Sequence, residues 1–65
     1  MGSIIYQLRI NRGLSQRELA TLCGVTQQFI QRIEKGKVYP SIQTVVKLAA
    51  ALGTTTDELL QMKVG

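Results

Sequence analysis

A short polar run at residues 26–32 holds the side chains of this 65-residue chain that are best suited to chemistry. A glutamine can pair bidentately with adenine through the N7 acceptor and the N6 donor, and an arginine can pair with guanine through O6 and N7. Gln27, Gln28 and Arg32 are therefore candidates for reading base edges in DNA. The plainer interpretation is a glutamine-rich helix face that contacts only solvent.

An apolar stripe through the same segment indicates an amphipathic helix. Val25, Ile30 and Ile33 recur on one helix face, so we expect them to be buried while the polar residues face outward. The expected helix covers residues 27–35 and begins after Thr26 as its N-cap. Its N-terminal end also favours a phosphate, because the helix dipole is positive there.

A second helix must hold this segment in place, and we expect residues 16–23 to form it. The turn between two closely crossing helices must allow a positive φ, which Gly24 does without steric strain. The first helix must present a small residue at the crossing, and Ala20 stands at that position. Together with the apolar stripe, these residues meet the steric needs of a helix-turn-helix over about residues 16–35.

Capping residues divide the whole chain into short helices, and no segment alternates as a strand would. The expected N-caps are Ser3, Ser15, Thr26, Ser41 and Thr55, and the expected helix ends are Gly13, Gly24, Gly36 and Gly53. Ser15 with Glu18, and Thr55 with Glu58, also have the spacing of a capping box. We therefore expect an all-α fold of five helices in one domain over residues 1–65.

The composition excludes several classes of function. The chain has no histidine and one cysteine, Cys23, so we expect no metal site, no cofactor and no disulfide framework. It lacks a catalytic set and is too short to enclose a large ligand cavity, so neither an enzyme nor a small-molecule receptor is expected. No apolar run approaches the roughly 18 residues that span a bilayer, and no secretory signal is recognisable. We therefore expect a cytoplasmic protein.

The net charge of +4 is unevenly distributed. Residues 1–47 hold seven basic and two acidic side chains, which indicates a polyanionic partner such as nucleic acid or an anionic membrane surface. Because the apolar stripes are interrupted by caps and face inward, they do not form the broad apolar face that a membrane would need. A charge that only keeps the protein soluble is the remaining alternative.

Taken together, the motifs resemble one family. The segments that carry the resemblance are residues 14–20, 24–26, 30, 33–36, 40–41 and 48–53. They are similar to those of the lambda-repressor/Cro-type helix-turn-helix regulators, which include 434-like phage repressors and bacterial XRE-type regulators. The resemblance covers about residues 5–60. It implies a lambda-repressor-like domain that binds palindromic operator DNA as a homodimer, with the third helix in the major groove, a docking geometry established for that family.

By this resemblance, Gln27, Gln28 and Arg32 align with the main base-reading positions, and Thr26 lies beside them. Phe29 departs from the family pattern. It is expected either to press against a thymine methyl group or to pack against the neighbouring loop.

Other residues are expected to contact the DNA backbone or to support the reading helix. Gln16 aligns with a residue that touches a phosphate and supports the first reading side chain. The full expected set is Gln16, Arg17, Gln31, Lys35, Lys37, Ser41 and Gln43. Such contacts position a protein without reading sequence, and they make its affinity fall with salt.

The resemblance also implies two structural features. Arg9 and Glu34 would form a buried or half-buried ion pair that ties the first helix to the third. Leu59, Leu60 and Met62 would form a small dimer contact, so we expect a monomer that pairs on the operator.

A repressor is the function that these features favour, and two alternatives stay open. One is an antitoxin-type regulator that also binds a protein toxin. The other is the DNA-binding fragment of a longer regulator.

Overall fold

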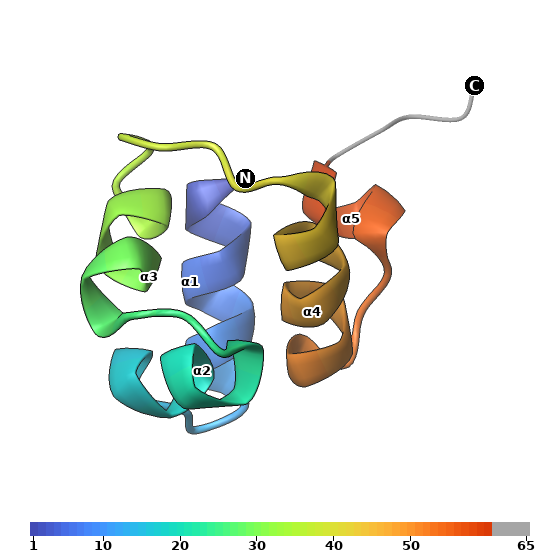
Figure 1. Ribbon diagram of the computed structural model, residues 1–65. Helices are drawn as coiled ribbons and strands as arrows, with labels where there is room; N and C mark the ends of the chain where they lie inside the picture. The colour runs from blue at the N-terminus through green and yellow to red at the C-terminus, as the bar shows by residue number, and fades with distance from the viewer. Residues whose placement is uncertain (61–65) are drawn as a thin grey trace.

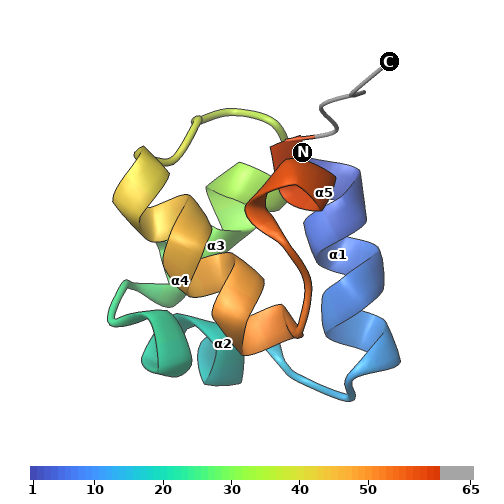
Figure 2. The same cartoon turned by 90° about the vertical axis from the view of Figure 1, so that its right-hand side faces the viewer.

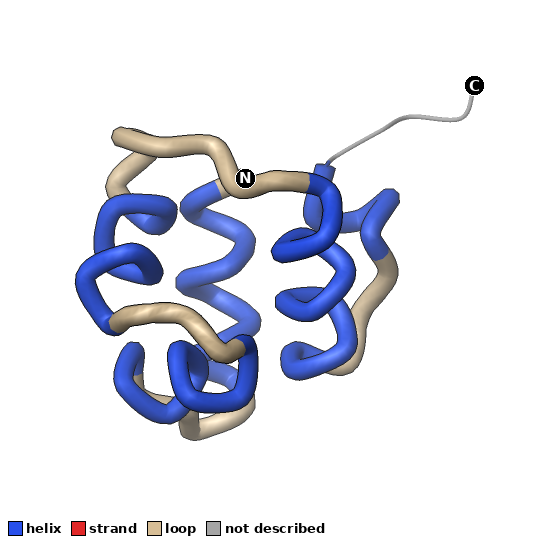
Figure 3. The backbone as a smooth tube through the Cα atoms, viewed as in Figure 1, coloured by secondary structure: helices blue, strands red, loops and turns tan. Residues whose placement is uncertain are grey.

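The computed structural model describes residues 1–60 and consists of helices joined by short loops (Figure 1). The helices are α1 (Gly2–Asn11), α2 (Gln16–Cys23), α3 (Gln27–Glu34), α4 (Ile42–Leu52) and α5 (Thr56–Leu60). No strand occurs within the described residues, as Figure 3 also shows. The all-α prediction is therefore confirmed. None of these helices has the length and apolar character needed to cross a bilayer.

Local capping sets the bounds of α2 and α4. The Ser15 hydroxyl accepts a hydrogen bond from the Glu18 amide at 3.0 Å, and the Glu18 carboxylate accepts one from the Ser15 amide at 2.9 Å. This reciprocal pair begins α2, and the Ser41 hydroxyl accepts the Thr44 amide at the start of α4. Both helices end at a glycine in the left-handed conformation, Gly24 after α2 and Gly53 after α4.

The two outer helices differ from the prediction. Helix α1 begins at Gly2 with Met1 as its N-cap and without a side-chain cap, so the expected Ser3 cap is wrong. A Cβ on Gly2 would lie 2.5 Å from the Ile33 carbonyl oxygen, so the first residue of α1 is in close backbone contact with the end of α3. This close approach is a tertiary contact, and the residues around Ser3 carry no local signal for it.

Only half of the second expected capping box forms, at the start of α5. The Thr55 hydroxyl accepts the Glu58 amide at 3.2 Å. The Glu58 carboxylate accepts instead from the Thr54 hydroxyl at 3.1 Å, so the return bond to the Thr55 amide is missing. The expected extension of this helix to Met62 lies outside the described residues.

One apolar core joins all five helices. Its members are Ile5, Leu19, Ala20, Cys23, Ile30, Ile33, Val45, Leu48, Ala49, Leu52 and Leu59. Helix α2 packs against both α3 and α4, α1 packs against α3 and α4, and α5 packs against α4 (Figures 1 and 2). The free cysteine is therefore a core residue, and burial raises the pKa of its thiol. This packing holds α3 at one side of the molecule with its outer face uncovered (Figure 1).

Candidate nucleic-acid interface

The turn between α2 and α3 is built around Gly24. Gly24 has φ = 67°, and the Val25 amide donates to the Ala20 carbonyl oxygen at 3.0 Å, which closes the end of α2. A Cβ on Gly24 would meet no atom within 4 Å. Glycine is therefore favoured here by the positive φ and not by a lack of space. Ala20 is buried, and its small side chain allows α2 and α3 to pack closely.

Helix α3 has a buried face and an exposed face. Ile30 and Ile33 are at most 1% exposed, and both lie in the core. The exposed side chains of α3, which we call the reading face, are Gln27, Gln28, Gln31 and Arg32. These four residues form two i, i+4 pairs on adjacent turns, so they lie close enough to contact one ligand together.

Thr26 and Phe29 flank the reading face, and both make contacts within the protein. The Thr26 hydroxyl accepts the Phe29 amide at 3.1 Å and so caps α3, although the residue remains exposed. The Phe29 ring is half-buried and packs against the apolar core. The expected contact of Phe29 with a thymine methyl group stays a prediction.

Three polar residues from three segments meet beside α3, and we call them the polar junction: Arg9, Gln16 and Glu34. The Arg9 Nε donates to Glu34 Oε2 at 2.6 Å, and Arg9 Nη2 donates to Glu34 Oε1 at 3.1 Å. Gln16 Nε2 also donates to Glu34 Oε1, at 3.0 Å. The expected ion pair is thus present, with both side chains less than a tenth exposed.

Arg9 is held at every part of its guanidinium. Nη1 donates to the Leu14 carbonyl oxygen at 2.9 Å in the loop before α2, and the Tyr6 ring stacks on the guanidinium with its centroid 5.3 Å from Cζ. The hydrogen bonds to the Glu34 carboxylate raise the pKa of Arg9 above its ordinary value. Arg9 therefore fixes α1, the following loop and α3 relative to one another.

Gln16 lies differently from the expectation. It was expected to support the first reading side chain, Gln27, but its amide nitrogen donates to Glu34 at the opposite end of α3. Gln16 is half-buried, so part of its side chain remains accessible.

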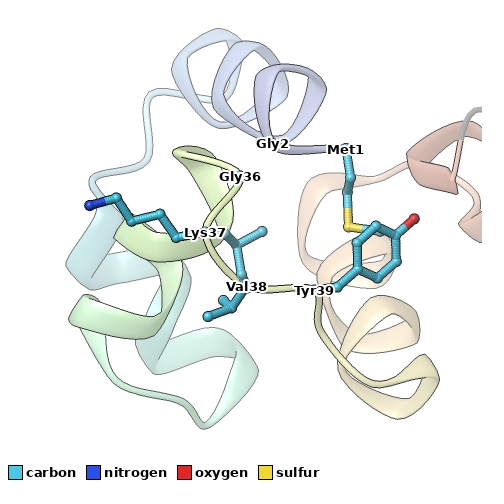
Figure 4. A pocket seen from close by; sticks show the side chains of 7 residues that line it. Met1, Gly2, Gly36, Lys37, Val38 and Tyr39 are labelled. Atoms are coloured by element: carbon cyan, nitrogen blue, oxygen red, sulfur yellow. The ribbon is translucent and has the colours of Figure 1, made fainter.

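The remaining residues expected to contact the DNA backbone lie on α2, at the end of α3 and from the loop before α4 into its first turn. Arg17, Lys35, Lys37, Ser41 and Gln43 are all exposed. The Ser41 hydroxyl is engaged as the N-cap of α4, as described above. Lys37 also belongs to the lining of a cavity of about 350 Å³ between the start of α1 and the loop that precedes α4. In Figure 4, the Lys37 side chain extends away from the Met1 and Tyr39 side chains.

The expected dimer contact is reduced by the fold. Leu59 is fully buried in this chain's own core, so it has no surface to offer to a second copy. Leu60 is half-buried, and Met62 lies outside the described residues. Three other large apolar residues are exposed on the loop before α4 and on α4: Tyr39, Ile42 and Val46.

Comparison with known proteins places this geometry among DNA-associated regulators. A family model described as "Helix-turn-helix" matches residues 5–59. A protein of Haemophilus influenzae described as an uncharacterized HTH-type transcriptional regulator is 54% identical over 43 residues, which cover 66% of this chain and 44% of that protein. The chain thus spans less than half of that relative.

Solved structures agree with the family match. The restriction-modification controller protein C.AhdI from Aeromonas hydrophila is similar to this chain with a TM-score of 0.85 and 36% sequence identity. The alignment covers 89% of this chain and 88% of the C.AhdI chain. The biofilm regulator SinR, solved in complex with DNA, is similar with a TM-score of 0.84 and 37% sequence identity. The alignment covers 91% of this chain and 95% of the SinR chain. At this identity and coverage, the likeness extends over the whole helical arrangement.

Proposed function

Because this chain belongs to the lambda-repressor-like helix-turn-helix family, we propose that it is a transcriptional regulator that binds double-stranded DNA with α3 in the major groove. The observation that carries the proposal is the division of α3 into a fully buried apolar face and an exposed face of amides and one guanidinium. The solved structure of the similar protein SinR in complex with DNA supports it. The two relatives named above are described as a transcriptional regulator and a controller protein.

On this proposal, Gln27, Gln28 and Arg32 read base edges. Their side chains are exposed on neighbouring turns, and glutamine and arginine carry the bidentate groups that distinguish adenine and guanine in the major groove. Each well-formed pair contributes roughly 1–3 kcal/mol of discrimination against a wrong base.

The residues around α3 provide contacts to the DNA backbone. The exposed members of this set are Arg17, Lys35, Lys37, Ser41 and Gln43, and half-buried Gln16 joins them. Such contacts set the register of the protein on the duplex, and the cationic ones release counterions, so the affinity falls with added salt.

A palindromic operator bound by two copies, with repression as the outcome, is the finer form of the proposal. In this family the half-sites lie one helical turn apart, about 34–36 Å. Of the two described residues of the expected dimer contact, Leu60 keeps accessible surface. Since the contact is small, pairing is expected to depend on the DNA.

The extent of the match to the Haemophilus relative supports a second possibility. Because this chain corresponds to 44% of that relative, it has the span of a DNA-binding domain of a longer regulator. In that case the DNA-reading residues are the same.

The experiment that tests the proposal is in vitro selection of duplexes bound at a stated salt concentration. The wild-type chain is expected to enrich a palindrome with adenine and guanine in each half-site. Gln28→Ala should lose the preference at one adenine, whereas Gln7→Ala, which removes an exposed glutamine of α1 that has no assigned role, should select the same palindrome. Selection of no sequence over random DNA would contradict sequence-specific binding.

A further inference from the structure

An open cavity lined by polar residues lies where α1, α2 and α3 meet, beside the reading face. Its volume is about 380 Å³, and its lining residues are Ser3, Tyr6, Gln16, Gln31, Glu34 and Lys35. Gln31 belongs to the reading face, and Lys35 is the C-cap of α3. The cavity, which we call the junction cavity, therefore opens at the edge of the surface that is proposed to face DNA.

The carboxylate in this lining does not repel an anion as a free carboxylate would. Glu34 Oε2 accepts from Arg9, and Oε1 accepts from both Arg9 and Gln16. Its charge is thus offset by the buried Arg9 guanidinium with which it is paired. The charge that remains in the lining is the ammonium of Lys35.

Tyr6 is held in place before any ligand arrives. Its ring stacks on Arg9, which is itself fixed by Glu34 and by the Leu14 carbonyl oxygen. Half of the Tyr6 surface is nevertheless exposed. A ring that is ordered but accessible can present its hydroxyl to a ligand with little loss of conformational freedom.

Four groups in the lining of the cavity can donate hydrogen bonds: the Tyr6 and Ser3 hydroxyls, the Gln31 amide and the Lys35 ammonium. A tetrahedral anion with several acceptor oxygens matches such a set. We infer that the junction cavity binds one phosphate of the DNA backbone, with Tyr6 and Lys35 as its principal donors, so that α1 forms part of the DNA interface. The inference rests on the proposed function and adds to it a residue, Tyr6, that sequence reasoning did not assign to DNA.

The test uses the full chain with two duplexes, the selected palindrome and an unrelated sequence of equal length. Tyr6→Phe keeps the ring on Arg9 and removes the hydroxyl, so it should weaken binding to both duplexes by about tenfold without changing the melting temperature. Lys35→Met should weaken both and should reduce the slope of log K against log salt by about 0.9, as expected for one released phosphate contact.

Arg12→Met is the matched control for the loss of one positive charge. The Arg12 guanidinium occupies the space beside Gly53 that a Cβ would take, at the C-terminal end of α4 and outside the junction cavity. This variant should leave the salt slope unchanged. An equal change of slope in Arg12→Met and Lys35→Met would overturn the inference, because the effect would then be one of net charge.

A methylphosphonate scan of the palindrome locates the contact. Removing the charge of one particular phosphate should weaken the wild-type protein by more than it weakens Tyr6→Phe, which keeps only the Lys35 contact to that phosphate. Wild-type affinity of Tyr6→Phe for both duplexes would overturn the inference and leave the proposed function standing. A chain that binds both duplexes equally, yet is weakened by Tyr6→Phe, would support the cavity and contradict sequence reading. Failure to bind either duplex would overturn both.

Discussion

The reading face and the polar junction are built from the same kinds of side chain but use them in opposite ways. At the polar junction, Arg9, Gln16 and Glu34 bond to one another across three segments of the chain. On the reading face, Gln27, Gln28 and Arg32 stay exposed on a helix whose other face is in the core. The comparison teaches that residue type does not separate a structural amide or guanidinium from a recognition one. What separates them is whether the fold brings a partner to the side chain.

The largest expected effect comes from breaking the polar junction at its centre. Arg9→Met leaves the Glu34 carboxylate buried without its counter-ion, which typically lowers the free energy of unfolding by about 3–5 kcal/mol. That loss is comparable to the whole stability of a domain of this size. Thermal melting followed by circular dichroism should show a much lower transition than in Arg12→Met. Equal melting curves for the two variants would contradict a structural role for Arg9.

The next effect falls on DNA affinity and leaves stability unchanged. Gln28→Ala and Arg32→Ala remove exposed groups of the reading face, so unfolding should change by less than about 0.5 kcal/mol. Affinity for the selected duplex should fall by about 1–3 kcal/mol each, with little change for an unrelated duplex. Fluorescence anisotropy at fixed salt measures both affinities. An equal loss on the two duplexes would assign these residues to the phosphate backbone instead.

Gln16 belongs to the polar junction and is also proposed to contact the DNA backbone near the reading face. Gln16→Ala removes one of three hydrogen bonds to a nearly buried carboxylate, so the free energy of unfolding should fall by about 1–2 kcal/mol. This loss is smaller than that for Arg9→Met, because both Arg9 bonds to Glu34 remain. Urea denaturation measures the change. A stability equal to wild type together with a weakened affinity for DNA would move Gln16 from the polar junction to the phosphate contacts alone.

The smallest effect is a dependence on pH at the start of α2. Hydrogen bonds from Ser15 hold the pKa of the exposed Glu18 carboxyl below its ordinary value of 4.5. Because the pKa is lower in the folded state, the stabilisation is present above the ordinary value and is lost as the pH falls through the folded-state value. Glu18→Ala should therefore melt slightly below wild type at pH 7, and the two curves should converge in acid. A difference that persists at pH 2 would contradict this origin.

The helices that surround the turn were predictable from local chemistry. Thr26 and Ser41 each cap the helix that follows through a hydrogen bond to an amide three residues on, and Gly24 ends α2 in the left-handed conformation. These are contacts between neighbours in the chain, so the sequence contains both partners. The reading face follows from the same source, since helical periodicity alone puts Ile30 and Ile33 opposite Gln28 and Arg32.

The features that sequence reasoning placed wrongly or missed depend on distant contacts. The start of α1 is decided by its approach to the carbonyl groups of α3, and the role of Tyr6 depends on the position of Arg9. Leu59 has the apolar character that a dimer contact needs, but α5 turns it into the core. No pattern within a few residues distinguishes these outcomes.

The sequence by itself thus determined an all-helical chain, its internal helix boundaries and an amphipathic α3 that carries base-reading chemistry. It did so because caps, left-handed glycines and helical periodicity are short-range effects. Only the tertiary structure decided that Gln16 bonds to Glu34, that Tyr6 borders a polar cavity beside the reading face and that Leu59 is unavailable to a partner. Those outcomes arise from the packing of five helices around one core, which brings together residues as far apart as Arg9 and Glu34.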